Sequence, residues 1–329
     1  MNKSRRFTVV YASDANYAKL TAISAVSLLK HNPGARVVLL GYNLEKEAQD
    51  IVRSRVESHG GEFVYLDVSG EIEKLKERGY CGYTSYAAYA RIFIPDLLHE
   101  EGKVIYLDGD TLVNGSISEM LDIQMDGKPV AFGTDCTPVS YKLFIKVTKS
   151  QPYYNSGVMV IDLVQWRKRH CTERFLDELE HPHGPLVLPD QDVFVRSIHE
   201  EIAPLGPKWN FIPHYYLFSY EGVLRVVGGE KCILFSKQDY LEAQRDPRIF
   251  HFLGHTLGRP WYTSSKHPMR EAYRQAAAEA GFPEFAEQTR PMSYDYKVQY
   301  WLHKLLPQSM FDVVCNMLYR INIRKNYHV

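Results

Sequence analysis

Residues 103–113 read Lys-Val-Ile-Tyr-Leu-Asp-Gly-Asp-Thr-Leu-Val, an apolar run that ends in two carboxylates separated by one glycine. The apolar half predicts a buried strand that closes at Asp108. Side chains at i and i+2 of an extended segment point to the same side, so Asp108 and Asp110 can converge on one cation, while Gly109 lets a ligand approach the backbone. The alternative is an ordinary Asp-Gly turn after a strand.

The stretch before this motif alternates between β-branched or aromatic runs and amphipathic runs. The predicted strands are residues 7–12, 36–40 and 62–68, and the predicted helices are residues 17–31, 45–59 and 85–98. Such alternation indicates crossover connections and a mostly parallel sheet, whose ligands bind beyond the carboxyl ends of the strands. Residues 13–16 and the Asp108 motif are therefore expected at the same edge of the sheet.

Length and charge limit the classes of protein to which the chain can belong. Its 329 residues can form one large α/β domain with an appendage or two modest domains, and either buries a sizeable core. Lys plus Arg and Asp plus Glu both total 39, so the chain lacks the basic excess expected of a nucleic-acid-binding protein. The 23 tyrosines suit a protein that handles sugars or lies near an interface.

Cysteine spacing and hydropathy indicate the compartment. The five cysteines are widely separated and never form a C-x-x-C pair, which argues against a disulfide framework or a zinc knuckle. The apolar run near the N-terminus is too short for a signal sequence and ends at Asp14. No window reaches the length of a transmembrane helix. The expected location is the cytoplasm, or the cytoplasmic face of a membrane as a peripheral protein.

Polar groups also follow the later predicted strands. A strand at 129–133 leads to Asp135, a polar turn at 153–157 enters an apolar strand, and a helix opens near Asp190. Acidic residues in a first helical turn are often only caps and dipole partners, so for 190–192 that interpretation stays open. The chain has neither a G-x-G-x-x-G motif nor a P-loop, so metal and side chains must hold any phosphate.

Several short motifs occur in a characteristic order: Val9–Tyr17, Tyr89–Arg91, Val104–Asp110, Asn155–Gly157, Asp190–Asp192, Trp209–Phe211, His251–Gly254 and Arg259–Trp261. Together they resemble glycosyltransferase family 8, which contains bacterial lipopolysaccharide galactosyl- and glucosyltransferases, general-stress glycosyltransferases and the glycogenins. The resemblance implies an α/β fold: a single nucleotide-sugar-binding, Rossmann-like domain of the A-type glycosyltransferase fold with a mostly parallel central sheet. This catalytic domain is expected over residues 1–265, and a C-terminal helical appendage over residues 266–329.

The resemblance implies that Asp108, Asp110 and His251 bind a divalent metal that bridges the diphosphate of a UDP-sugar. Two carboxylates and an imidazole favour Mn²⁺, with Mg²⁺ as the alternative. The other implied nucleotide contacts are Ala12, Ser13, Asp14, Asn16, Tyr17, Gly109, Gly254 and Arg259. Tyr17 is a stacking partner for the base or, alternatively, a helix residue packed on the sheet.

One segment departs from the family pattern. Family members usually carry a lysine in the spacing H-x-x-G-x-x-K before Pro-Trp, whereas this chain is one residue longer and has Arg259 there. Arginine and lysine are not equivalent phosphate ligands. Arg259 is still expected to reach the diphosphate, because the extra Gly258 can bend the loop.

The implied catalytic and sugar-binding residues are Arg91, Asp135, Asn155, Asp190 and Gln191. Arg91 would reach the sugar ring and its phosphate. Asp135, Asn155 and Asp190 would bond the sugar hydroxyls, and Gln191 would face the anomeric carbon. Enzymes of this family retain the anomeric configuration. Because a double displacement needs a carboxylate nucleophile and the matching position carries an amide, we expect front-face substitution, in which the leaving phosphate oxygen deprotonates the acceptor hydroxyl.

The C-terminal stretch has a different character. Residues 296–323 form two amphipathic segments broken at Pro307, with aromatic and basic side chains intermixed. This pattern suits a helix that lies in a membrane interface. The alternative is a helical cap on the catalytic domain or on another subunit of a homo-oligomer.

The predicted function is metal-dependent, retaining transfer of glucose or galactose from UDP-glucose or UDP-galactose to a saccharide or glycolipid acceptor, such as lipopolysaccharide or another cell-envelope glycan. Two alternatives stay open. One is a glycogenin-like initiator that glucosylates its own tyrosine, which the tyrosine content permits. The other is a non-catalytic binder of sugar nucleotides or glycans on the same fold.

Overall fold

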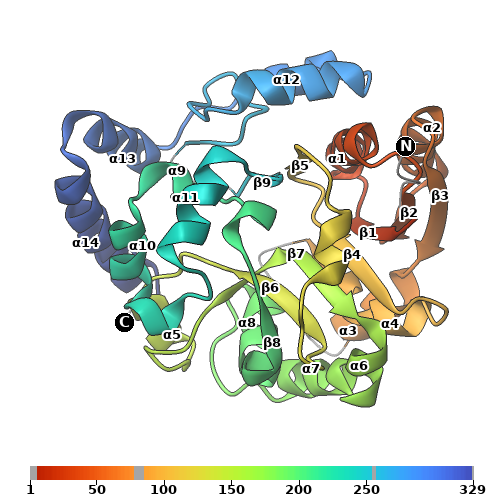
Figure 1. The fold of residues 1–329 in the computed structure, drawn as a ribbon, viewed down its shortest axis with the longest axis horizontal. Helices are drawn as coiled ribbons and strands as arrows, with labels where there is room; N and C mark the ends of the chain where they lie inside the picture. Colours follow the sequence, from red (N-terminus) through yellow and green to blue (C-terminus); the bar gives the residue numbers. More distant parts are fainter. Residues whose placement is uncertain (1–5, 78–84, 254–256, 328–329) are drawn as a thin grey trace.

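A seven-stranded mixed sheet runs through the centre of the computed structural model, which describes residues 6–77, 85–253 and 257–327 (Figure 1). The strand order is β3-β2-β1-β4-β7-β6-β8. These strands are β1 (Thr8–Ser13), β2 (Arg36–Gly41), β3 (Glu62–Asp67), β4 (Lys103–Leu107), β6 (Val130–Thr134), β7 (Tyr154–Asp162) and β8 (Ile202–Leu205). Four of the six pairings are parallel, and β7 runs antiparallel to both neighbours. The mostly parallel α/β sheet predicted from the sequence is confirmed.

The parallel half of the sheet follows from the alternation of apolar and amphipathic runs. Val9 in β1 and Val37 in β2 are fully buried, and these parallel strands are connected by α1 (Ala18–His31). α1 is buried over most of its length because it also packs on α12 (Arg270–Glu279) and on a short second sheet. By contrast, α2 (Lys46–Ser58) buries only Val52 and Val56 and exposes its charged face, as its binary pattern predicts.

The other helical segments are mostly short. They are α3 (Ser69–Glu77), η1 (Tyr86–Phe93), α4 (Ile94–Leu97), η2 (Ser118–Asp122), α5 (Val139–Phe144), α6 (Leu163–Lys168), α7 (Cys171–Glu180), α8 (Pro189–Ile198), η3 (His199–Glu201), η4 (Pro207–Trp209), α9 (His214–Leu217), α10 (Tyr220–Val227), η5 (Glu230–Cys232), α11 (Lys237–Arg245), α12 (Arg270–Glu279), η6 (Pro283–Glu287), α13 (Tyr294–Leu305) and α14 (Gln308–Tyr327). The helix expected at 85–98 is mainly 3₁₀. α6 and α7 are separated where His170 takes a left-handed conformation, with φ of 52°.

A two-stranded ribbon of β5 (Thr111–Val113) and β9 (Ile249–His251) extends the carboxyl edge of the main sheet. Its antiparallel register pairs Thr111 with His251. The amide of Phe252 donates to the carbonyl of Asp110 at 2.9 Å. The ribbon therefore brings a histidine from late in the chain to the aspartates that follow β4.

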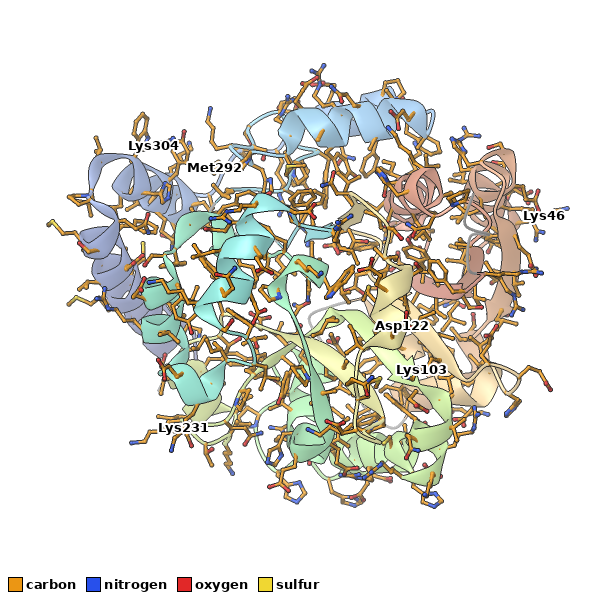
Figure 2. The ribbon with its side chains drawn as sticks, viewed as in Figure 1. Lys46, Lys103, Asp122, Lys231, Met292 and Lys304 are labelled. Atoms are coloured by element: carbon orange, nitrogen blue, oxygen red, sulfur yellow. The ribbon has the colours of Figure 1, made fainter. Side chains whose placement is uncertain are left out.

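The C-terminal helices pack on the body of the molecule. Tyr273 and Ala277 of α12 lie in the same apolar core as α1, and Phe311 and Cys315 of α14 lie in that core beside α10. Side chains such as Lys304 point outward at the periphery (Figure 2). Among the helices of the described residues, none is long and apolar enough to span a membrane. The boundary at residue 265 stays a prediction.

Candidate active site

A cavity of about 450 Å³ opens at the carboxyl ends of β1 and β4 and reaches the first turn of α8. Its wall contains most of the site residues that the sequence predicted: Ala12, Ser13, Asp14, Tyr17, Arg91, Asp108, Gly109, Asp110, Asp135, Asn155, Asp190, Gln191, His251 and Arg259. Asn16 is exposed and lies outside this wall, and Gly254 lies outside the described residues. The fold thus gathers residues from both halves of the chain around one space.

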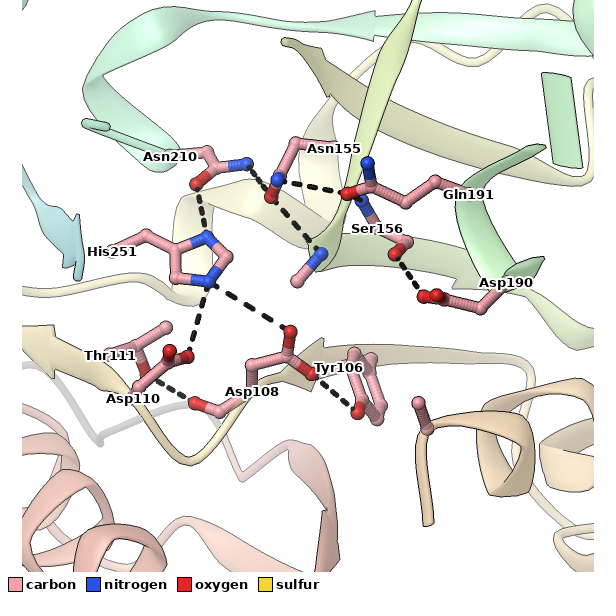
Figure 3. Close-up of polar contacts among 12 residues, drawn as sticks. Tyr106, Asp108, Asp110, Thr111, Asn155, Ser156, Asp190, Gln191, Asn210 and His251 are labelled. Atoms are coloured by element: carbon pink, nitrogen blue, oxygen red, sulfur yellow. Dashed lines mark hydrogen bonds and ion pairs between the residues drawn. The ribbon is translucent and has the colours of Figure 1, made fainter. Parts of the chain in front are cut away.

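Asp108, Asp110 and His251 form a compact triad (Figure 3). One potential ligand atom from each residue lies within 4.8 Å of the others. Nε2 of His251 is 3.2 Å from Oδ1 of Asp110 and 3.8 Å from Oδ2 of Asp108. Two carboxylates and an imidazole are a suitable donor set for a borderline-hard divalent cation, so these residues fit a metal ion.

The protonation of the triad depends on competition between burial and charge. Burial raises the pKa of Asp108, although Arg91 acts in the opposite direction. Burial also opposes ionisation of Asp110, but His251 and Arg259 together act in the opposite direction, and the pKa of Asp110 is lowered. Burial disfavours the His251 imidazolium, yet Asp110 and Asp108 raise its pKa above the usual value. A proton on His251 thus offsets carboxylate charge that a bound cation would otherwise neutralise.

Arg91 links the triad to the opposite wall of the cavity. Its side chain is buried and stacks over the ring of Tyr106 at 4.6 Å. One guanidinium nitrogen donates to Oδ1 of Asp108 at 2.9 Å, and another lies 3.3 Å from Oδ2 of Asp190. Burial works against the charge, but Asp108 and other acidic neighbours raise the pKa of Arg91 further. These contacts are internal, so Arg91 does not form an ion pair on the protein surface.

The far wall is built from amide and carboxyl groups on β7, on α8 and directly after β6. Nδ2 of Asn155 donates to Oε1 of Gln191 at 3.0 Å and to Oδ2 of Asp135 at 3.2 Å. Ser156 donates from its hydroxyl to Asp190 at 2.7 Å. Asp190 and Gln191, in the first turn of α8, both line the cavity. They are therefore not only helix caps and dipole partners.

The turn after β1 is braced by Asp14. Its Oδ1 accepts from the backbone amides of Asn16 at 2.9 Å and Tyr17 at 3.2 Å, and its Oδ2 accepts from the Ser85 hydroxyl at 2.5 Å. These bonds shape the turn that leads into α1. The prediction that Asp14 also bonds the nucleoside stays a prediction.

The divergent segment before Trp261 reaches the cavity. Gly258 has φ of 72°, a left-handed conformation that favours glycine, and Arg259 lines the cavity wall. Nη2 of Arg259 is 3.9 Å from Oδ2 of Asp110, and its guanidinium lies over the Trp261 ring at 5.3 Å. The bend therefore brings a cation near the metal triad, while its contact with a diphosphate stays a prediction.

Sequence reasoning missed three residues that hold the predicted ones. The Tyr106 hydroxyl donates to Oδ1 of Asp108 at 2.7 Å, Ser156 bonds Arg91 and Asp190, and Asn210 bonds His251. The strand period could have found Tyr106, because it lies two residues before Asp108 on one side of the strand. Ser156 and Asn210 lie inside recognised motifs, but a motif does not give the direction of a side chain.

Comparison with known proteins agrees with this geometry. Residues 8–264 match the sequence model of a protein family described as "Glycosyl transferase family 8". The chain belongs to glycosyltransferase family 8. Membership implies a nucleotide-sugar donor and a saccharide acceptor, and it makes the chain a glycosyltransferase.

The alignments with individual relatives cover different shares of those proteins. General stress protein A of Bacillus subtilis is 30% identical over 281 residues, which are 83% of this chain and 93% of that protein. Lipopolysaccharide 1,2-glucosyltransferase of Escherichia coli K12 is 27% identical over 216 residues, or 59% of this chain and 58% of that protein. Glycosyltransferase GlyE of Streptococcus pneumoniae is 23% identical over 211 residues, and the match spans only 49% of that protein.

A solved structure matches the fold of this family 8 chain. The galactosyltransferase LgtC, crystallised with donor and acceptor sugar analogues, superposes with a TM-score of 0.66 at 20% identity. The match covers 89% of this chain and 99% of that one. The A-type glycosyltransferase fold predicted from the sequence is confirmed.

Proposed function

We propose that this family 8 glycosyltransferase is a metal-dependent, retaining hexosyltransferase that moves glucose or galactose from a UDP-sugar to a saccharide acceptor. The observation that carries the proposal is a shared cavity. Its wall combines the donor atoms of the metal triad with a second cluster of hydroxyl-binding groups, Asp135, Asn155, Asp190 and Gln191. A plain Asp-Gly turn would not explain why a buried histidine faces both aspartates.

Asp108, Asp110 and His251 would hold Mn²⁺, with Mg²⁺ as the alternative, because carboxylates with one imidazole favour the softer ion. When bound, the ion neutralises charge that develops on the departing UDP. Arg259 would add a permanent positive charge at the diphosphate. The residues at the end of β1, Ala12 to Tyr17, would hold uracil and ribose.

At the sugar end, Asp135, Asn155 and Asp190 would bond the hydroxyls of the hexose. Oε1 of Gln191 already accepts from the Ser156 amide at 3.2 Å and from Asn155 at 3.0 Å. A carbonyl oxygen has two lone pairs, and these two donors occupy both of them on Gln191. The Gln191 amide is therefore a fixed dipole and is poorly suited to act as a nucleophile. The arrangement supports front-face substitution: the bond from C1 to phosphate breaks, the acceptor oxygen bonds C1 on the same face, and its proton passes to the phosphate oxygen.

Hydrolysis of UDP-hexoses tests the proposal without an acceptor. We expect slow release of UDP from UDP-glucose or UDP-galactose in the presence of Mn²⁺, and loss of this release after chelation. A covalent hexose adduct on Asp190 would contradict the front-face route. If the protein bound UDP but hydrolysed no UDP-hexose, a binding function would be favoured. Stepwise mass gain of the chain itself with UDP-glucose would support self-glucosylation.

We also propose that α13 and α14 bring the enzyme to a membrane that carries a glycolipid acceptor. Most of the large apolar side chains exposed in the described residues lie on these helices: Tyr294, Trp301, Leu305, Met310, Val313, Met317 and Ile321. Lys304 lies at the same outer edge (Figure 2). Apolar and aromatic side chains beside a basic residue suit the interface of an anionic bilayer.

Vesicle flotation measures this contact directly. The double variant Trp301→Ser with Leu305→Ser should lose binding to anionic vesicles, whereas Val164→Ser, which changes an apolar side chain 54% exposed elsewhere, should not. If the double variant abolished a dimer seen by light scattering and left vesicle binding intact, the surface would be a subunit contact.

The cysteines support the proposed cytoplasmic location. Within the described part of the chain, the free thiols are those of Cys136, Cys171, Cys232 and Cys315, and all four are buried. Disulfides are typical of oxidising compartments and rare in the cytosol. Unchanged thermal unfolding with and without reductant would agree with this location, whereas reductant-dependent stability would contradict it.

A further inference from the structure

A chain of side-chain amides joins the metal triad to the sugar-binding wall (Figure 3). Nδ1 of His251 is 3.1 Å from Oδ1 of Asn210, and Nδ2 of Asn210 is 2.9 Å from Oδ1 of Asn155. Nδ2 of Asn155 is in turn 3.0 Å from Oε1 of Gln191. Asn210 is only 2% exposed and does not itself line the cavity. It can affect a ligand only through its neighbours.

Two backbone amides fix the direction of every bond in this chain. The Ser156 amide donates to Oε1 of Gln191, and the Gly157 amide donates to Oδ1 of Asn155, both at 3.2 Å. Each of those sites must therefore be an oxygen, so Asn155 presents its NH₂ group to Gln191. By the same reasoning Asn210 presents its NH₂ group to Asn155 and its oxygen to His251.

In the neutral form of His251, the ring hydrogen is thereby assigned to Nδ1, because only a donor can face the Asn210 oxygen. This tautomer leaves Nε2 as the nitrogen that faces Asp110 and Asp108. A histidine that binds metal usually donates its other ring N–H to such an acceptor, which fixes the tautomer and the ring orientation.

We propose that Asn210 is a positioning residue that sets His251 for metal binding and, through Asn155, holds the Gln191 amide against the donor sugar. The inference rests on the proposed function for the roles of metal and sugar. Asn210 follows η4, Asn155 lies on β7 and His251 lies on β9, so the chain connects three segments at one point. Asn210 thus has two arms: its bond to His251 and its bond to Asn155. A displacement of the histidine ring shifts both bonds, which couples metal occupancy to placement of the hexose.

Three variants separate the two arms from a general effect on packing. Asn210→Ala removes both arms. Asn210→Asp keeps an oxygen for the His251 N–H but loses the donor to Asn155. Asn32→Ala is the matched control: Asn32 is also buried, donates to the Leu28 and Gly115 carbonyls, and accepts from the Ile117 amide, but it does not line the cavity.

Binding of Mn²⁺ to the protein alone, followed by electron paramagnetic resonance of the free ion, reads the first arm. We expect Asn210→Ala to weaken this binding about 10- to 100-fold. Asn210→Asp should bind Mn²⁺ no more weakly than wild type, since a carboxylate partner strengthens a histidine ligand. Asn32→Ala should lower stability without changing Mn²⁺ affinity.

Hydrolysis of the UDP-hexose at saturating Mn²⁺ reads the second arm. Asn210→Asp should lower kcat about tenfold or more with little change in KM, because the loss of the bond to Asn155 affects an interaction made mainly in the transition state. Asn32→Ala should retain the wild-type kcat.

Equal Mn²⁺ affinity in Asn210→Ala and wild type would overturn the inference. So would a nitrogen-15 spectrum of neutral His251 with its hydrogen on Nε2, a measurement that needs no variant. If Asn210→Ala does not fold, Asn210→Ser, which keeps a small polar group, takes its place with the same expected direction. Absence of hydrolysis in wild type would refute the proposed function, whereas Mn²⁺ affinity and the tautomer would still test Asn210.

Discussion

Replacement of Arg91 by methionine should destabilise the fold while leaving Mn²⁺ affinity intact. Arg91 is only 3% exposed. Its guanidinium donates to Asp108 at 2.9 Å, lies 3.3 Å from Asp190, and bonds the carbonyls of Ala88 and Ser156 at 2.8 Å. Methionine occupies much of the same space without a donor, so two carboxylates lose their shared cation.

Removal of one partner from a buried ion pair costs about 3–5 kcal/mol. The lower end applies here, because the Asp108 side chain is 26% exposed and keeps its bond from Tyr106, and Asp190 keeps its bond from Ser156. A loss of about 3 kcal/mol moves the urea midpoint by about 1 M when the slope is near 3 kcal/mol per M. Arg91→Lys keeps the charge but not the planar fork, so we expect about half of that loss.

Urea unfolding of the metal-free protein, followed by tryptophan fluorescence, measures the effect. The control is Arg36→Met: Arg36 contacts Glu101 at 2.7 Å and Glu62 at 3.3 Å, but its side chain is 28% exposed. Such a pair contributes at most about 1 kcal/mol. Mn²⁺ affinity of Arg91→Met should not fall, since Asp108 loses a competing cation. Equal midpoints for Arg91→Met and Arg36→Met would refute the reasoning.

Three further substitutions have expected outcomes. Asp110→Asn should lower Mn²⁺-dependent hydrolysis on the order of a thousandfold yet leave the thermal midpoint of the metal-free protein within about 4 °C; wild-type turnover would remove Asp110 from the metal site. Gly157→Ala should weaken Mn²⁺ binding and cost about 1–3 kcal/mol in urea unfolding, because the new Cβ would lie 2.1 Å from Cε1 of His251 and 2.6 Å from Oδ2 of Asp108. Gly206→Ala, where the new Cβ meets open space, is the control, and equal effects of the two would exclude a clash at the triad. Burial lowers the pKa of His267 to about 3, well below the unfolded value near 6.5, so its contribution to stability is present above that value and declines as pH falls toward 3. Between pH 7.5 and 5.5, wild type should lose about 1.4 kcal/mol more stability than His267→Asn; parallel curves for the two proteins would show that His267 does not stay neutral when buried.

The sequence by itself determined the features that depend on neighbours along the chain. Apolar runs such as 7–12 and 36–40 alternate with helical periods, and this alternation indicates strands joined by crossover helices. The two-residue period of a strand places Asp108 and Asp110 on one side. The glycine at 258 permits the left-handed bend that carries Arg259 to the cavity. Each of these follows from local backbone geometry.

Only the tertiary structure decided which segments meet and in what orientation. The antiparallel direction of β7 and the ribbon that pairs Thr111 with His251 arise from contacts between distant segments. Arg91 is an internal cation and not a surface one, because the chain folds Asp108 and Asp190 around it. The assignment of hydrogen to Nδ1 of His251 depends on the positions of donors on other segments. Spacing in a sequence does not contain those positions, since hydrogen bonds are directional and form only when separate strands and helices have packed.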